Sequence, residues 1–193
     1  MSEPTTVITD YLLGAVTAYL AWRLFQNRGA ERCRRWWSRA FVALALGAFL
    51  GGTWHGFVQN YWLWKATQLT VGIAASAMMV ATAFATLPAR ARSTVIGIAA
   101  AMFVLYAGWV LVDERFLVVV ADTAIAFALV AALHLWKWNG WILGGVAVSL
   151  AAGLVQASGM ALHAHFNHND LYHVIQIAAM ALFYRGAREL RDS

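Results

Sequence analysis

The chain has 193 residues, of which 62% are hydrophobic and 12% are charged. The apolar share of an ordinary soluble domain is nearer to half, so this composition argues against one and predicts an integral membrane protein. The net charge of +5 comes from basic residues beside the ends of apolar segments. That placement favours contact with anionic lipid headgroups over binding of nucleic acid.

Seven apolar segments follow one another along the chain, each close to the roughly 20 residues that a helix needs to cross a hydrocarbon core. The stretch before the first, MSEPTTVITD, is acidic and lacks the basic region of a secretory signal, so we expect a first helix there rather than a leader. The last segment is short, and its helix is expected to begin near Asn169 and to run to Ala187. The segments are residues 7–25, 40–58, 62–87, 95–112, 116–135, 141–162 and 171–184. They predict an all-α fold, with residues 1–193 forming one integral membrane bundle of seven transmembrane helices.

The basic residues predict the orientation of this bundle. When the loops are assigned alternately to two sides, all but two of the 14 Lys and Arg residues fall on one side, the exceptions being Lys65 and Arg115. Because basic loops stay in the cytoplasm, the amino terminus is expected outside and the carboxyl terminus inside. Tryptophans near the segment ends fit aromatic belts at both interfaces. We expect a multi-pass protein of the cell membrane, a bacterial inner membrane; the sequence does not indicate an oligomeric state.

The second segment carries two pairs of glycines four residues apart, Gly47 with Gly51 and Gly52 with Gly56. Small residues at this spacing allow a neighbouring helix to approach closely, so we expect these glycines to lie at helix contacts.

Three ionisable residues are predicted inside helices near the outer interface. Asp10 is expected in the first turn of the first helix, His55 in the last turns of the second and His173 one turn into the last. An ionisable side chain is costly in hydrocarbon and usually faces the bundle interior and a partner. Because all three lie in the same leaflet, we expect them to meet.

The stretch HAHFNHNDLYH, residues 163–173, holds four of the chain's six histidines. Asn169 or Asp170 is expected to cap the last helix, and Asp170, His173 and Gln176 recur at steps of three on one stripe. Asp170 could bind an ion together with His173 or orient its ring, and His168 could add a ligand from the loop. The alternatives are solvated histidines and an aspartate that only caps the helix.

The candidate metal ligands are therefore His55, His173, Asp170 and His168. Zinc is the expected ion, because imidazole and carboxylate suit it and no thiolate lies on that side. A zinc held by three protein ligands keeps a water whose pKa falls to about 7, which would supply a nucleophile.

Two acids are candidate catalytic residues, Asp10 and Asp122. Asp122 is expected roughly 9 Å into the fifth helix at the α-helical rise, where it needs a partner. Lys65, Gln156 or the histidine cluster could provide one, and a purely structural hydrogen bond remains open.

The histidines in GGTWHGF and NDLYHVIQ, with seven helices and an outer amino terminus, resemble the superfamily of alkaline ceramidases and progestin/adiponectin receptors. That resemblance implies zinc held by one histidine of helix 2 and two of helix 7, and hydrolysis of a lipid amide in the ceramidases. His55 matches the helix 2 ligand and His173 the second helix 7 ligand. Closer in sequence are small bacterial multi-pass membrane proteins with the same TDYLL, GGTWHGF and DLYHVIQ stretches.

The chain departs from that superfamily at three positions. The first helix 7 ligand falls at Asn169, between His168 and Asp170, and the serine one turn before the helix 2 histidine is Gly51. The family's aspartate falls at Ala66, so Asp10 or Asp122 would have to replace it.

The sequence is consistent with two alternative functions. One is a zinc-dependent membrane hydrolase that acts on a lipid amide or ester. The alternative is a non-enzymatic seven-helix protein that binds a ligand or senses pH through histidines, which titrate near pH ~6.5.

Overall fold

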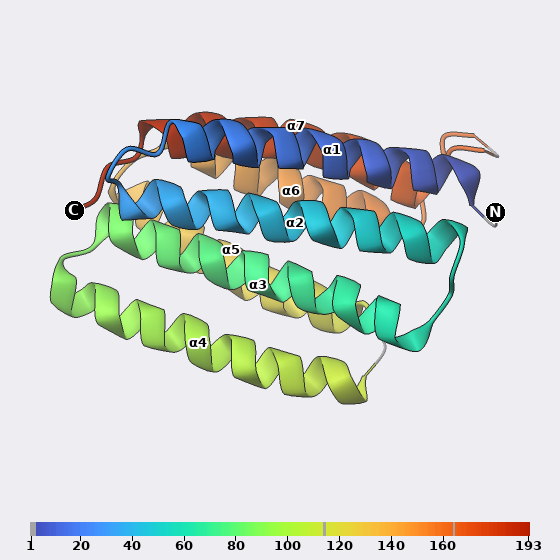
Figure 1. Cartoon of the computed structure of the whole chain (residues 1–193), viewed down its shortest axis with the longest axis horizontal. Coiled ribbons are helices and arrows are strands. Elements are labelled where there is room, and N and C mark those ends of the chain that lie inside the picture. The colour runs from blue at the N-terminus through green and yellow to red at the C-terminus, as the bar shows by residue number, and fades with distance from the viewer. Residues whose placement is uncertain (1–2, 114, 164) are drawn as a thin grey trace.

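The computed structural model describes residues 3–113, 115–163 and 165–193, and over these residues the chain is all helical. Seven long helices lie side by side along the long axis of the molecule and are joined by short loops (Figure 1). The predicted all-α fold with seven helices is confirmed for the described part of the chain. The helices are α1 Pro4–Gln26, α2 Arg32–Gly56, α3 Tyr61–Thr86, α4 Ala89–Val112, α5 Leu117–Trp136, α6 Gly140–Ser158 and α7 His168–Glu189.

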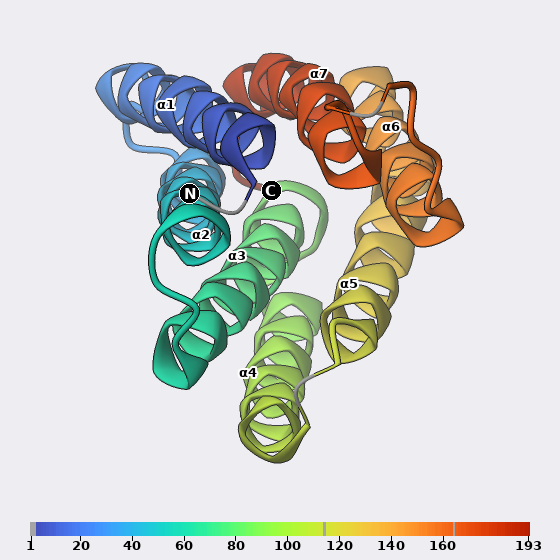
Figure 2. The same cartoon turned by 90° about the vertical axis from the view of Figure 1, so that its right-hand side faces the viewer.

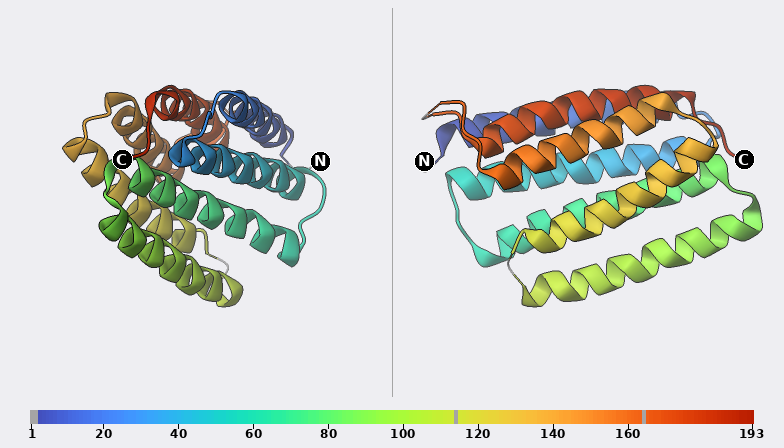
Figure 3. Two further views of the ribbon diagram at one scale, coloured as in Figure 1. Left: turned by 60° about the vertical axis from the view of Figure 1, so that its left-hand side comes forward. Right: turned by 180° about the vertical axis from the view of Figure 1, so that it is seen from behind.

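Successive helices reverse direction, so the bundle has two distinct ends (Figures 1 and 3). The start of α1 and the loops α2–α3, α4–α5 and α6–α7 lie at one end, which we call the amino end. The chain terminus after α7 lies at the other, the carboxyl end. Viewed from the amino end, α7 lies between α1 and α6, and α4 stands on the far side of the bundle (Figure 2). Segments from the two ends of the chain are therefore neighbours.

In the part of the chain that the structure describes, four helices are long and apolar enough to cross a membrane. They are α3, α4, α5 and α6. These four helices differ in the fraction of their surface that is buried inside the bundle. Helix α3 packs on three neighbours and is mostly buried, whereas α4 exposes large apolar residues such as Val104 and Leu105, the latter 74% exposed. An apolar helix with an exposed apolar surface is typical of contact with lipid.

The start of α2 lies eight residues before the expected boundary at residue 40. The stretch RCRRWWSR continues the helix, because its basic side chains turn outward while Cys33 and Trp37 are buried. Trp37 packs against Phe41 and against Phe183 of α7. Mean hydropathy alone does not identify these eight residues as helix, because one face of the helix is charged there and the other face is part of the core.

The boundaries around the last loop also differ from expectation. Helix α6 ends at Ser158 rather than near residue 162, because Gly159 adopts a left-handed backbone with φ of 69°. The expected cap of α7 at Asn169 or Asp170 was wrong. Asn167 is the cap: its side chain accepts from the backbone N–H groups of Asn169 and Asp170, and Asp170 accepts from the N–H of Asn167 at 2.7 Å. This reciprocal capping box places Asp170 in the first turn.

Glycines of α2 lie at close helix contacts, as their spacing predicts. A Cβ atom added to Gly52 would lie 2.7 Å from the ring of Tyr11, and one added to Gly56 would collide with Val7. On the other side of α2, a Cβ at Gly47 would lie 2.9 Å from the hydroxyl of Thr70 in α3. These glycines let α1 and α3 approach α2 from two directions.

The residues after α7 fold back onto the carboxyl end. The carboxylate of Asp192 accepts from the backbone N–H groups of Arg32 and Cys33, at 3.0 and 2.8 Å, and so caps α2. Burial opposes ionisation of Asp192, but these backbone hydrogen bonds outweigh it and hold its pKa below the ordinary value. The N–H of Ser193 donates to the carbonyl of Phe84 at 2.9 Å. A carboxylate brought from the far end of the sequence thus satisfies orphan donors of α2.

The contact between α1 and α2 leads to a first prediction. Gly52→Ala should lower the free energy of unfolding by about 1–3 kcal/mol, because its Cβ overpacks against Tyr11 and against Cβ of Asp10 at 2.9 Å. Gly51→Ala is the matched control, since its Cβ would meet neighbours only at 3.6–3.7 Å. Denaturant unfolding of both variants in detergent, followed by circular dichroism, measures the difference; equal stability would contradict the close contact.

Candidate functional site

The amino end of the bundle contains a buried aspartate–histidine pair. Oδ1 of Asp10 in α1 lies 3.1 Å from Nε2 of His173 in α7. Both residues are buried, at 4% and 7% exposure. Because α1 begins at Pro4, Asp10 lies in the second turn rather than the expected first. The prediction that these two residues meet is confirmed.

Thr9 extends this pair to Asp170. Its hydroxyl lies 3.0 Å from Nδ1 of His173 and 3.4 Å from Oδ1 of Asp170. Both ring nitrogens of His173 therefore have a polar partner, one from each of two adjacent residues of α1. Asp170 in turn holds the start of α7 through its capping bond, so the helix end and the histidine belong to one hydrogen-bonded chain.

This chain accommodates more than one protonation state in the same geometry. A neutral His173 can donate from Nε2 to an ionised Asp10 and accept from Thr9 at Nδ1, and the single proton of the Thr9 hydroxyl is then not given to Asp170. His173 can also donate from Nδ1 to Thr9 and accept at Nε2 from a protonated Asp10. A doubly protonated ring paired with the carboxylate uses the same two contacts. We call Thr9, Asp10, Asp170 and His173 the polar centre.

A second pair lies beside the polar centre. Nδ1 of His55, near the end of α2, lies 2.9 Å from Oε2 of Glu3. The ring of His55 contacts the indole of Trp54, with ring centres 5.1 Å apart, and Trp54 contacts Trp64 at 4.8 Å. Tryptophan side chains therefore stand next to the histidine.

One cavity of about 100 Å³ joins the two pairs. Asp10, His55 and His173 line it, and Thr17 and Gln176 line it further along α1 and α7. Within the described part of the chain, Oδ2 of Asp10, the hydroxyl of Thr17 and Oε1 of Gln176 are buried and have no hydrogen-bond partner. A volume of this size has room for an ion or a small polar molecule and is well below the usual size of a drug-binding pocket.

The predicted metal ligands are only partly assembled here. His55 and His173 line the cavity, and Asp170 is linked to His173 through Thr9. His168 is the first residue of α7 and is not among the described residues that line the cavity. Asp122 lies half-buried on α5 and also falls outside that lining, within electrostatic range of Tyr106 of α4.

Lys65, an expected partner for Asp122, has other contacts. Its ammonium donates to the backbone carbonyls of Val110 and Asp113, the second at 2.8 Å. A cation at this position satisfies carbonyls at the end of α4 and complements the helix dipole.

Among the described His, Cys, Asp and Glu residues, one set of three has ligand atoms within 4.8 Å of one another. It consists of Glu31, Cys33 and Asp192 at the carboxyl end. The hydrogen bonds of the tail account for it, because Asp192 caps α2 and its own N–H donates to Glu31 at 2.6 Å. The four predicted ligands thus do not form a set as compact as this one, and zinc stays a prediction.

Two contacts of the site were not predicted from the sequence. Thr9 was overlooked because threonine is not ionisable, although Thr6, Asp10 and Thr17 recur on one face of α1 at steps of four and seven. The pairing of Glu3 with His55 was not predicted either. A search for small polar residues next to Asp10 in the sequence and on its face of α1 would have found Thr9 and Thr17.

The sequence pattern of one protein family matches residues 5–192. The chain belongs to this family of unknown function, DUF6962. The match spans all seven helices and includes every residue of the polar centre. No curated protein and no solved structure matches the chain.

Truncating His173 tests the polar centre. His173→Ala should lower the free energy of unfolding by about 1–3 kcal/mol, because it leaves Asp10 and Thr9 buried without the ring. His168→Ala on the same helix is the control, since no side-chain hydrogen bond of His168 is seen among the described residues, and it should change stability by about 0.5 kcal/mol at most. Thermal unfolding in detergent measures both variants; a larger loss for His168→Ala would contradict the assignment.

Proposed function

We propose that this protein is a multi-pass cell-membrane protein whose polar centre takes up protons and binds a small cationic or polar ligand, without catalysing a reaction. All seven helices span the membrane in this proposal, with the amino terminus outside and the carboxyl terminus in the cytoplasm. The observation that carries it is the buried hydrogen bond between Asp10 and His173 beside the cavity.

Helix length and burial support seven spans. The shortest helix has 19 residues and would extend about 28 Å, close to the hydrocarbon thickness. Three of the ionisable residues that lower the hydropathy of α1 and α7 are buried, namely Asp10, Asp170 and His173, whereas Arg23, Arg185, Arg188 and Glu189 lie toward the carboxyl end of these helices. Polar groups that face each other in this way remove the main objection to placing α1 and α7 in lipid.

The charges around the cavity favour a cation. Helix α1 contributes Asp10 together with Glu3 just before it, α7 contributes Asp170, and the histidines come from α2 and α7. Tyr172 is the remaining titratable group on α7 that lines the cavity, and the residues that α3 contributes, among them Trp64 and Thr67, carry no charge. With neutral histidines and ionised acids the centre is negative, so a proton or a small cation reduces the net charge.

Infrared difference spectroscopy tests proton uptake directly. Acidification of the purified protein in nanodiscs should produce the C=O stretching band of a protonated buried carboxyl, and Asp10→Asn should remove this band. His173→Gln should shift the band, because the carboxyl loses the imidazole at 3.1 Å. Asp192→Asn is the control, since Asp192 lies at the opposite end, and it should leave the band unchanged. A band that persists in Asp10→Asn would refute the proposal.

A zinc-dependent hydrolase of a lipid amide or ester is the second candidate, favoured by one observation. His55 of α2 and His173 of α7 line the same cavity, as the resemblance to the ceramidase superfamily implies. The residues do not fit zinc as they stand. Both ring nitrogens of His173 are engaged, Nδ1 of His55 contacts Glu3, and ligand atoms at 2.0–2.1 Å from one ion require a tighter set.

Metal analysis separates the two candidates. Protein that is purified without chelator, dialysed against zinc and then freed of unbound zinc should keep well below one equivalent of the metal if the centre binds protons and holds small cations only reversibly. A full equivalent that disappears in both His55→Ala and His173→Ala, with His168→Ala unchanged, would instead establish the zinc site. Circular dichroism of each variant confirms that the helices are retained.

A further inference from the structure

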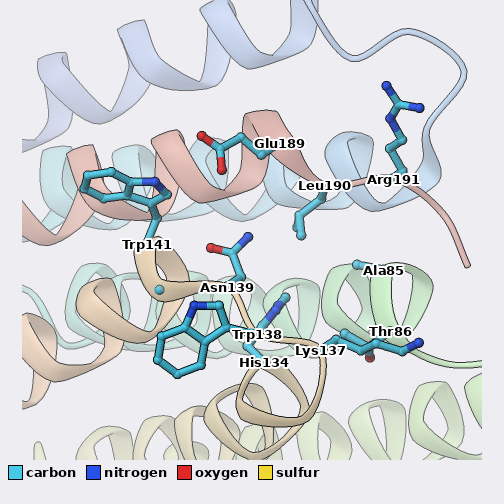
Figure 4. A pocket seen from close by; sticks show the side chains of 11 residues that line it. Ala85, Thr86, His134, Lys137, Trp138, Asn139, Trp141, Glu189, Leu190 and Arg191 are labelled. Carbon is cyan, nitrogen blue, oxygen red and sulfur yellow. The ribbon is translucent and has the colours of Figure 1, made fainter.

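A separate pocket of about 730 Å³ opens at the carboxyl end of the bundle, opposite the polar centre. It lies where α3 and α5 end, α6 begins and the chain leaves α7 (Figure 4). The polar centre and the proposed function use none of its residues. The side chains that matter here are His134, Lys137, Trp138, Asn139 and Trp141.

His134 contributes an unused polar atom to this pocket. The residue is 1% exposed, and its Nδ1 is buried with no hydrogen-bond partner among the described residues. Its Nε2 lies 3.3 Å from the hydroxyl of Thr82 in α3. When that hydroxyl donates to Nε2, the ring proton resides on Nδ1, which is then a donor in need of an acceptor.

The start of α6 supplies further donors. Asn139 caps the helix by accepting from the N–H of Ile142 at 3.1 Å. The N–H groups of Gly140 and Trp141 precede that bond and, by helix geometry, have no intrahelical acceptor. The positive end of the helix dipole and the ammonium of Lys137 add to them, so the pocket offers N–H donors and positive charge to one ligand.

The charged residues at the rim of the pocket do not cancel its positive charge. Glu189 lines the pocket from α7, but its side chain is exposed and drawn apart from Lys137 and His134 in Figure 4. Arg191 extends away from Asn139 in the same view and is left out of the site. His134 and Asn139, at the start of α6, line the same pocket, and Lys137 lies at its exposed rim, where its ammonium stands 4.9 Å from the centre of the Trp136 ring.

Tryptophans connect the pocket to lipid. Trp138 is 73% exposed and Trp141 is 37% exposed, and they flank the end of α5 and the start of α6, two of the apolar membrane-length helices. Exposed tryptophans beside such helix ends are typical of the level of lipid headgroups. A basic pocket between helices at that level is suited to a phospholipid headgroup.

We propose that this pocket binds a phosphate group, with His134 Nδ1, the first N–H groups of α6 and Lys137 as its donors. A membrane phospholipid is the source that the tryptophans favour, and a free phosphate ion has the same chemistry. The site is independent of the polar centre and would remain if the proposed function failed.

Binding to the purified full chain in a neutral detergent distinguishes these sources. Three probes are titrated and followed by tryptophan fluorescence: short-chain phosphatidylglycerol, the diacylglycerol with the same acyl chains but no phosphate, and inorganic phosphate. Lys137→Gln is the test variant, and Arg90→Gln is its control, because Arg90 is exposed at the same end outside the pocket. His134→Leu is a second variant that removes the buried donor, and its fold is checked by circular dichroism.

We expect phosphatidylglycerol to bind and diacylglycerol not to bind. Lys137→Gln should weaken binding about fivefold, the effect of one lysine near an anionic surface, while Arg90→Gln leaves it unchanged. Inorganic phosphate that binds with the same dependence on Lys137 supports the site and makes a free anion its ligand. Equal binding of diacylglycerol, or equal weakening by Lys137→Gln and Arg90→Gln, would overturn the proposal, as would wild-type affinity in both Lys137→Gln and folded His134→Leu.

Discussion

The burial of Asp10 is the constraint on which the amino end of the bundle depends. A carboxyl group inside an apolar bundle is costly unless a partner meets it, and here His173 does so at 3.1 Å. The partner comes from the last helix. The hydrogen bond that buried Asp10 requires therefore joins α1 to α7, which are the first and last helices of the chain. Gly52 of α2 completes the arrangement, because only a residue without a side chain lets Asp10 and Tyr11 approach that helix so closely.

Carboxylates also act at the helix ends, where each one accepts hydrogen bonds from more than one donor. Asp170 closes the capping box of α7 and also receives the Thr9 hydroxyl, so the start of the helix and the polar centre are stabilised together. At the carboxyl end Asp192 caps α2 with a residue that lies beyond α7. Contacts distant in sequence thus close the bundle at both ends, and a shift of α7 along its axis would break both sets of hydrogen bonds.

Apolar segment length was enough to predict seven helices, because a long apolar run leaves the backbone few alternatives to helix. It failed at the start of α2, where charged and buried residues share one turn, and at the start of α7, where Asn167 rather than a later residue is the cap. The meeting of Asp10 with His173 was predictable because both lie in the same half of the bundle and both need an interior partner. The exact partners of each ring nitrogen depend on side-chain packing that no linear pattern contains.

Helix phase explains which predicted residues reach the site. At about 100° per residue, Asp170 lies roughly 60° around α7 from His173, whereas His168 lies roughly 140° away and faces elsewhere. The sequence placed Asp170 on the stripe of His173 and offered His168 only as a further ligand from the loop. Asp122 of α5 is likewise outside the cavity lining and lies within electrostatic range of Tyr106 of α4.

Gly51 offers the clearest physical distinction between the proposed proton-binding centre and the zinc site of the superfamily that the sequence resembles. A Cβ at this position would lie 3.7 Å from each carboxylate oxygen of Asp10, so a serine there could place its hydroxyl beside that carboxylate. With glycine, Oδ2 of Asp10 has no hydrogen-bond partner among the described residues and lies at the cavity. A proton or a small cation at this oxygen would supply the interaction that a serine hydroxyl would make. Glycine at position 51 and asparagine at position 169 are two of the positions where the chain lacks a group that the resemblance to the zinc hydrolases implies, and in the proposed function this leaves the Asp10 carboxylate open to reversible binding.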